Sequence, residues 1–143
     1  MFLIAHLSYI GAFLKSISFA SLENIGESKK IFIGSASTIV LITFILNSID
    51  LWEKTTNLTL FLLYGLILTI MVICAFLRID SVQKKSFWLV IVGAVLFGIS
   101  DNLLATLKFN HIHSDIGRAV IMLTYYSAQY LIVEGVKEEK MIK

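Results

Sequence analysis

Asp101 is the residue in this sequence whose type and setting point most directly to chemistry. It lies inside the apolar run 93–105, on the same helical face as Ala94, Gly98 and Ala105. Small residues at this spacing let helices approach closely, so we expect the Asp101 carboxyl group to point into a helical bundle. An acidic side chain buried in a membrane is costly and tends to mark a functional site. Burial favours the protonated carboxyl group, which suits a general acid.

Four further polar residues are predicted to lie near the depth of Asp101. His6 and Tyr9 are one helical turn apart near the N-terminus, and Tyr125 and Gln129 are four residues apart near the C-terminus. These side chains can converge with Asp101 on one pocket in the same half of the bundle. The alternative is that they form hydrogen bonds between helices and bind no ligand.

Other candidate motifs are weak. His111 and His113 lie in a predicted loop with Asp115, but two histidines supply too few ligands for a metal site, and a solvated loop is the simpler interpretation. The single cysteine, Cys74, excludes a disulfide framework and a CxxC motif, and we expect a buried, inert thiol. Nucleophile-elbow, P-loop and HExxH motifs are absent from the sequence. We therefore predict neither a metal nor another cofactor.

The composition identifies the environment in which these residues must work. Of 143 residues, 57% are hydrophobic and 15% are charged, the mean hydropathy is +0.85, and proline is absent. Soluble domains have about 45–50% apolar and about 25% charged residues, so the chain is predicted to be an integral membrane protein. A formal net charge of +2 is too small to indicate nucleic-acid binding.

Five apolar stretches are long enough to cross a membrane, which takes about 20 residues. Transmembrane β-strands would alternate in polarity over about 10 residues, whereas these stretches are continuously apolar, so we predict an all-α membrane bundle. The predicted spans are 2–20, 31–49, 58–77, 87–107 and 117–135, within one domain covering 1–143. Because no basic residue precedes the first stretch, which contains Lys15, we expect a retained helix and not a signal peptide.

Basic residues near the predicted span ends indicate the orientation. Lysine and arginine are enriched in cytoplasmic loops. One side carries eight of them, Lys29, Lys30, Arg78, Lys84, Lys85, Lys137, Lys140 and Lys143, and the other carries three, Lys54, Lys108 and Arg118. We therefore predict a cytoplasmic C-terminus, in what we expect to be a bacterial plasma (inner) membrane. Trp52 and Trp88 fall at span ends, where aromatic residues gather at the interface.

Three ordered segments resemble motifs of the YhhN family. Residues 5–9 (AHLSY), 93–105 (GAVLFGISDNLLA) and 125–132 (YYSAQYLI) are similar to family patterns of approximately AHxxY, GAxxFxxSDxxLA and YYxAQxLI. Tyr64 and Met71 also fit a YxxxxxxM-like stretch of the family. The resemblance covers essentially the whole chain. It implies a transmembrane lysoplasmalogenase, which hydrolyses the vinyl-ether bond of lysoplasmalogen to a fatty aldehyde and a glycerophospho-headgroup.

The resemblance also suggests roles for the residues in the motifs. As a hypothesis, Asp101 is the general acid and His6 orients or deprotonates water. Substrate-binding roles fall to the other polar residues of the motifs, Tyr9, Ser100, Tyr125, Tyr126 and Gln129. The partner implied is a lysophospholipid or another membrane lipid.

The chain departs from the family in one respect. It begins at what resembles the middle of the family, and the N-terminal Gly-Asp motif has no counterpart, so we expect a second aspartate to be missing. Asp101 would then act alone, or a neighbouring subunit of a homo-oligomer would help it. Two alternatives stay open, namely a non-catalytic lipid-binding or scaffold protein and a small proton-coupled transporter.

Overall fold

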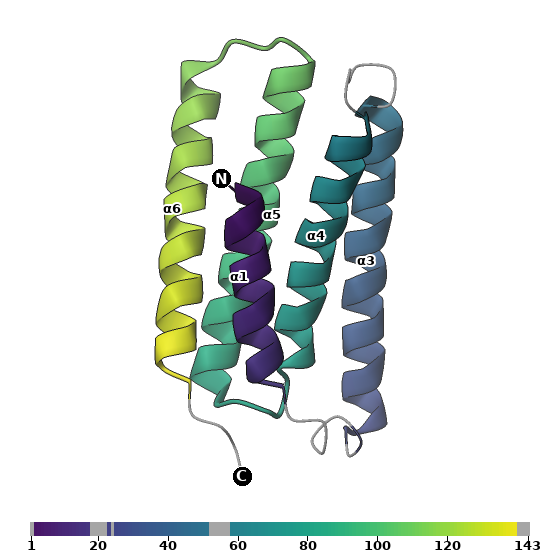
Figure 1. Ribbon diagram of the computed structural model, residues 1–143, viewed down its shortest axis with the longest axis vertical. Helices are drawn as coiled ribbons and strands as arrows, with labels where there is room; N and C mark the ends of the chain where they lie inside the picture. The colour runs from purple at the N-terminus through teal and green to yellow at the C-terminus, as the bar shows by residue number, and fades with distance from the viewer. Residues whose placement is uncertain (1, 18–22, 24, 52–57, 140–143) are drawn as a thin grey trace.

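The computed structural model describes residues 2–17, 23, 25–51 and 58–139. The regular elements of this described part are five helices, which confirms the predicted all-α bundle. Their axes run side by side along the long dimension of the molecule (Figure 1). The helices are α1 (Phe2–Lys15), α3 (Glu27–Leu51), α4 (Leu58–Leu77), α5 (Lys84–Phe109) and α6 (Asp115–Lys137).

Three of the described helices are long and apolar enough to cross a membrane. These segments are Glu27–Leu46, Lys84–Lys108 and Asp115–Lys137, and they make the chain an integral membrane protein. The apolar segments Leu3–Lys15 and Leu62–Leu77 are shorter. Trp88 at the start of α5 is 55% exposed, whereas Trp52 lies outside the described residues.

The first helix is shorter than the predicted span 2–20. The α-helix ends at Lys15. A tighter turn follows, in which Ser16 N–H donates to Phe13 O, three residues earlier, at 3.0 Å. The Ser16 hydroxyl is directed at Glu139 Oε2, 2.8 Å away, which ties this end of α1 to the segment after α6. Residues 18–20 of the predicted span lie outside the described part.

Glycines set the close packing of α5 against α6. A Cβ atom on Gly93 would lie 2.8 Å from Ile132 Cγ1 and 2.9 Å from Ala128 O. A Cβ atom on Gly135 would lie 2.7 Å from Val90 Cγ2. Such distances are shorter than side-chain contacts allow, so the two helices can approach this closely only where both positions lack a side chain.

The other helices assemble around α4, which packs against α1, α3 and α5. In Figure 1, α1 lies in front of α5, between α6 and α4, and α3 forms the outer edge. Phe13, Met71, Val90 and Phe97 are fully or almost fully buried in a shared core. Cys74 is buried beside them as a free thiol, which confirms its predicted setting.

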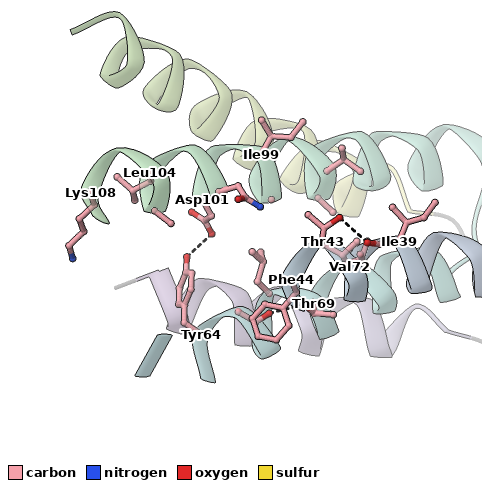
Figure 2. Close-up of a pocket in the computed structure, with 18 residues that line it drawn as sticks. Ile39, Thr43, Phe44, Tyr64, Thr69, Val72, Ile99, Asp101, Leu104 and Lys108 are labelled. Atoms are coloured by element: carbon pink, nitrogen blue, oxygen red, sulfur yellow. Dashed lines mark hydrogen bonds between the residues drawn. The ribbon is translucent and has the colours of Figure 1, made fainter. Parts of the chain in front are cut away.

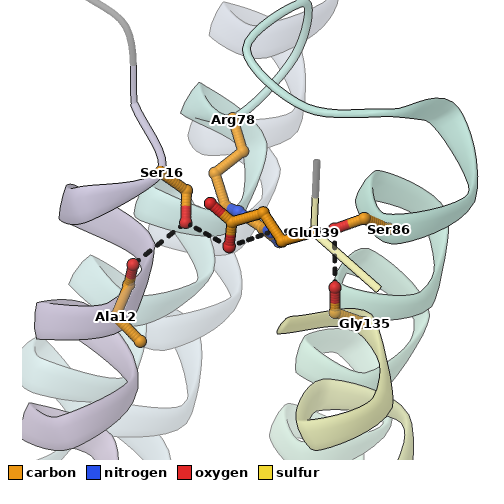
Figure 3. A network of polar contacts seen from close by, with 6 residues as sticks. All are labelled: Ala12, Ser16, Arg78, Ser86, Gly135 and Glu139. Atoms are coloured by element: carbon orange, nitrogen blue, oxygen red, sulfur yellow. Dashed lines mark hydrogen bonds and ion pairs between the residues drawn. The ribbon is translucent and has the colours of Figure 1, made fainter. Parts of the chain in front are cut away.

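A buried guanidinium group closes one end of the bundle (Figure 3). Arg78, just beyond α4, was counted among the basic residues that indicate the orientation, and its side chain is 0% exposed. Its Nη2 donates to Ser86 Oγ at 3.0 Å and to Glu139 Oε2 at 3.4 Å, and its Cζ lies 5.3 Å from the centre of the Phe13 ring. Burial lowers the pKa of Arg78, and the charge of Glu139 opposes that shift.

We expect Glu139→Ala to destabilise the bundle by about 1–3 kcal/mol, because it removes the anionic partner of a buried cation. Thermal unfolding in detergent would measure the loss. Glu138→Ala is the matched control, since Glu138 pairs with the exposed Lys85 at 3.0 Å and such pairs contribute little. Equal stability losses for the two variants would contradict a structural role for the Arg78–Glu139 pair.

Candidate active site around Asp101

Asp101 brings three helices together through one carboxylate oxygen. The residue is 8% exposed, and it is the one buried acidic residue in the described part of the chain. Tyr64 of α4 donates its hydroxyl hydrogen to Asp101 Oδ2 at 2.6 Å (Figure 2). His6 Nε2 of α1 lies 3.5 Å from the same oxygen. The carboxyl group is therefore oriented by two side chains that lie 37 and 95 residues away from it in the sequence.

Tyr64 is the residue that the sequence-based site omitted. A tyrosine in an apolar helix has many possible roles, and the only signal for this one was its place in the YxxxxxxM-like stretch. In the structure its ring also packs edge-on against the His6 ring, with centroids 5.3 Å apart. His6 itself is 0% exposed, so its position is set by packing as well as by the nearby carboxylate.

An elongated cavity of about 580 Å³ lies between α3, α4 and α5 and reaches Asp101. The predicted shared face of α5 is confirmed, because Ala94, Gly98, Asp101 and Ala105 all line this cavity. The prediction that small residues permit close helix packing fails at Gly98 but not at Ala94, which is 0% exposed and belongs to the buried core. A Cβ atom on Gly98 would meet nothing within 4 Å, so open space lies beside this residue.

The wall of the cavity is mainly apolar. Leu68 and Val72 of α4 and Ile99 and Leu104 of α5 contribute to it. Thr69 also lines it, but its hydroxyl donates to the carbonyl of Gly65 within its own helix at 2.8 Å. Asp101 is the one acidic and Lys108 the one basic residue in the lining, and Figure 2 shows Lys108 beyond Asp101 at one end of the row.

A second group of predicted site residues surrounds the ring of Phe97, which does not line the cavity. The ring centroid of Phe97 lies 4.8 Å from that of His6, 6.3 Å from Tyr9 and 5.2 Å from Tyr125. Gln129 Nε2 donates to the Tyr125 hydroxyl oxygen at 2.6 Å. These residues do gather near Asp101, with His6 as the link, but they do not line the cavity.

The two remaining predicted binding residues lie elsewhere. Ser100 is 1% exposed, and its hydroxyl donates to the carbonyl of Ile121 at 3.2 Å, which joins α5 to α6. Tyr126 is 64% exposed on the outer face of α6, with its ring 5.7 Å from that of Tyr125. Neither residue lines the cavity, so any contact of theirs with a substrate stays a prediction.

No three histidine, cysteine or acidic side chains in the described ranges are grouped so that they could hold a metal ion. His111 and His113 are exposed in the connection between α5 and α6, and Asp115 forms an ion pair with Arg118. The chemistry that this site can offer without a metal is proton transfer by a buried carboxyl group next to an apolar cavity.

The fold and this site define a class: a helical membrane protein with an ionisable group held beside a cavity that suits an apolar molecule. The chain belongs to the YhhN family, because the sequence model of that family matches residues 1–136. No curated protein matches it, and no solved structure matches it.

Proposed function

We propose that this protein hydrolyses the vinyl-ether bond of a lysoplasmalogen, with Asp101 as the general acid. The observation that supports the proposal best is a single buried carboxyl group at the wall of an apolar cavity, hydrogen-bonded by Tyr64. A lipid chain suits an apolar cavity, and a carboxyl group can supply the proton for the first step of this reaction. Membership of the YhhN family is consistent with the activity.

The reaction needs one acid and one water molecule. The Asp101 proton is transferred to the β-carbon, where the electron pair of the C=C bond forms the new C–H bond and leaves an oxocarbenium ion. The carboxylate then stabilises that cation. Water adds to the α-carbon and returns a proton to the carboxylate. The hemiacetal transfers its hydroxyl proton to the glycerol oxygen as the C–O bond breaks, which releases the aldehyde and the glycerophospho-headgroup.

Tyr64 and His6 support this role through Asp101. Because Tyr64 donates to Oδ2, the acidic proton is placed on Oδ1, and the orientation of the carboxyl group is restricted. His6 Nε2, 3.5 Å from Oδ2, is close enough to exchange a proton with the carboxyl group after a small movement. We propose that both residues position the acid, and the role of His6 toward water stays a prediction.

We expect Asp101→Asn to lower aldehyde release by at least about 100-fold, because an amide cannot supply the proton and general acids contribute about 10²–10⁴-fold. The assay uses purified protein in detergent with a lysoplasmalogen, and the released fatty aldehyde is measured. Asp80→Asn is the control, since Asp80 lies outside the cavity, pairs with Lys29 at 2.7 Å and has a φ of 60° that asparagine tolerates.

Equal activity of the wild-type protein and Asp101→Asn would remove Asp101 from the mechanism. A wild-type protein that binds lysophospholipid but releases no aldehyde would instead identify a lipid-binding protein, and a flux driven by a proton gradient in vesicles would identify a transporter.

We expect Tyr64→Phe to lower kcat by about 10-fold with little change in KM, because it removes one hydrogen bond to the acid and leaves the cavity wall in place. The pH profile of kcat should shift as well. In an Asp101→Asn background the same substitution should have no further effect, since its role depends on the carboxyl group. Tyr130→Phe is the control, because Tyr130 is 67% exposed. Additive losses in the double variant would contradict this positioning role.

A further inference from the structure

We infer that Lys108 binds the phosphate group of a single-chain phospholipid whose chain lies in the cavity along α5. This inference names the ligand of the cavity, and only its statement about which bond reaches Asp101 rests on the proposed function. Three features support this assignment, namely the order of residues along the cavity, its open side and the space beside Gly98.

The cavity residues of α5 form one continuous stripe. Ala94, Gly98, Asp101, Ala105 and Lys108 follow each other at intervals of four and three residues, and all of them line the cavity. At 1.5 Å per residue the stripe is about 21 Å long, and Asp101 lies about 10 Å from Lys108 along the helix axis. From Lys108 to Ala94, the stripe thus has a polar end, then the acid Asp101, and then an apolar end. The headgroup, the linkage and the chain of a lysophospholipid follow one another in the same order.

Charge complementarity favours an anionic headgroup at the Lys108 end. The ammonium group of Lys108 lies on a long flexible chain at the last turn of α5, where it remains exposed. In a membrane this position corresponds to the headgroup level, where a lysine can bind phosphate as a point charge. The glycerol unit of the lipid, together with the reach of the lysine side chain, can span the separation between Lys108 and Asp101.

The cavity is open on the side that faces lipid. Ile39 of α3 and Val95, Ile99 and Leu104 of α5 line it and are 64%, 43%, 51% and 41% exposed. Helix α4 lies between α3 and α5 and forms the inner wall (Figure 1). A lipid can therefore move from the bilayer into the cavity between α3 and α5 without leaving an apolar environment.

The space beside Gly98 gives the chain its path. Gly98 is one turn from Asp101 on the side away from Lys108, it lines the cavity, and a Cβ atom there would meet nothing within 4 Å. The apolar residues Leu68 and Val72 of α4 also line the cavity. The lipid chain is thus expected to pass Gly98, with its first bonds next to the Asp101 carboxyl group.

Lys108→Gln should weaken binding of a lysophospholipid at least about 10-fold, the factor that corresponds to about 1.4 kcal/mol for a lost charge-assisted contact. The probe is an alkyl-ether lysophosphatidylcholine, which has no vinyl-ether bond, and it is titrated against purified Asp101→Asn protein carrying the lysine change. The same titration is repeated with the phosphate-free alkyl glycerol, whose affinity should not change. Lys84→Gln, at the other end of α5, is the control and should leave both affinities unchanged.

Equal loss for both probes, or no loss for either, would overturn the assignment of Lys108. Because the probe is not cleaved, this result is independent of catalysis. Normal binding together with no aldehyde release from a lysoplasmalogen would refute the proposed function alone. Selective binding of a two-chain phospholipid or of inorganic phosphate would refute the single-chain ligand.

Gly98→Leu should lower the affinity for the long-chain probe at least about 10-fold, because the new side chain occupies the path of the lipid chain. A short-chain homologue of the same lysophospholipid should lose less. Gly34→Leu is the matched control, since a Cβ atom at Gly34 would also meet nothing within 4 Å but Gly34 lies on α3 outside the cavity lining. Leucine is a better helix former than glycine at both positions, so both variants should fold. Unchanged long-chain binding by Gly98→Leu would contradict the proposed path.

Discussion

The site depends on the burial of one carboxyl group inside an apolar bundle. A polar group removed from water is costly unless it is hydrogen-bonded, and Asp101 is 8% exposed on a membrane-spanning helix. Its Oδ2 receives the Tyr64 hydroxyl and lies near His6, so α4 and α1 must both meet α5 at the level of this residue. The arrangement of these three helices thus follows from the requirement to satisfy one oxygen atom.

Helix α5 has two faces with opposite properties, and each is made by small residues. On one face, Gly93 allows α6 to come so close that an added Cβ atom would clash. On the other face, Gly98 lines the cavity, and a Cβ atom there would meet nothing within 4 Å. The first face gives the bundle a rigid pair of helices, and the second leaves a cavity beside the acid. Asp101 is therefore held on a well-packed helix while its carboxyl group borders a space large enough for an apolar chain.

Buried polar residues serve different purposes at the two ends of α5. Near its N-terminal end, Arg78 pairs with Glu139 and Ser86 and contacts the Phe13 ring, and this network joins α1, α4, α5 and the segment after α6. Nothing in this network lines the cavity, so its role is to hold the bundle together. Toward the other end, Asp101 and Lys108 both line the cavity, where an ionisable side chain can meet a ligand. Charged residues therefore stabilise the bundle at one end of α5, whereas at the other end they take part in the proposed chemistry.

The sequence by itself determined the helices and the position of the unusual acid. Long apolar stretches can satisfy their backbone groups in a membrane only as helices or closed barrels, and a carboxyl group within such a stretch is conspicuous because it is costly. Only the tertiary structure decided which side chains meet. Tyr64 is the hydrogen-bond partner of Asp101, Ser100 donates to a carbonyl of α6 and does not line the cavity, and Arg78 is buried. Hydropathy assigns a residue to a helix, whereas its partners depend on how the faces of several helices pack, and that packing depends on contacts between residues far apart in the chain.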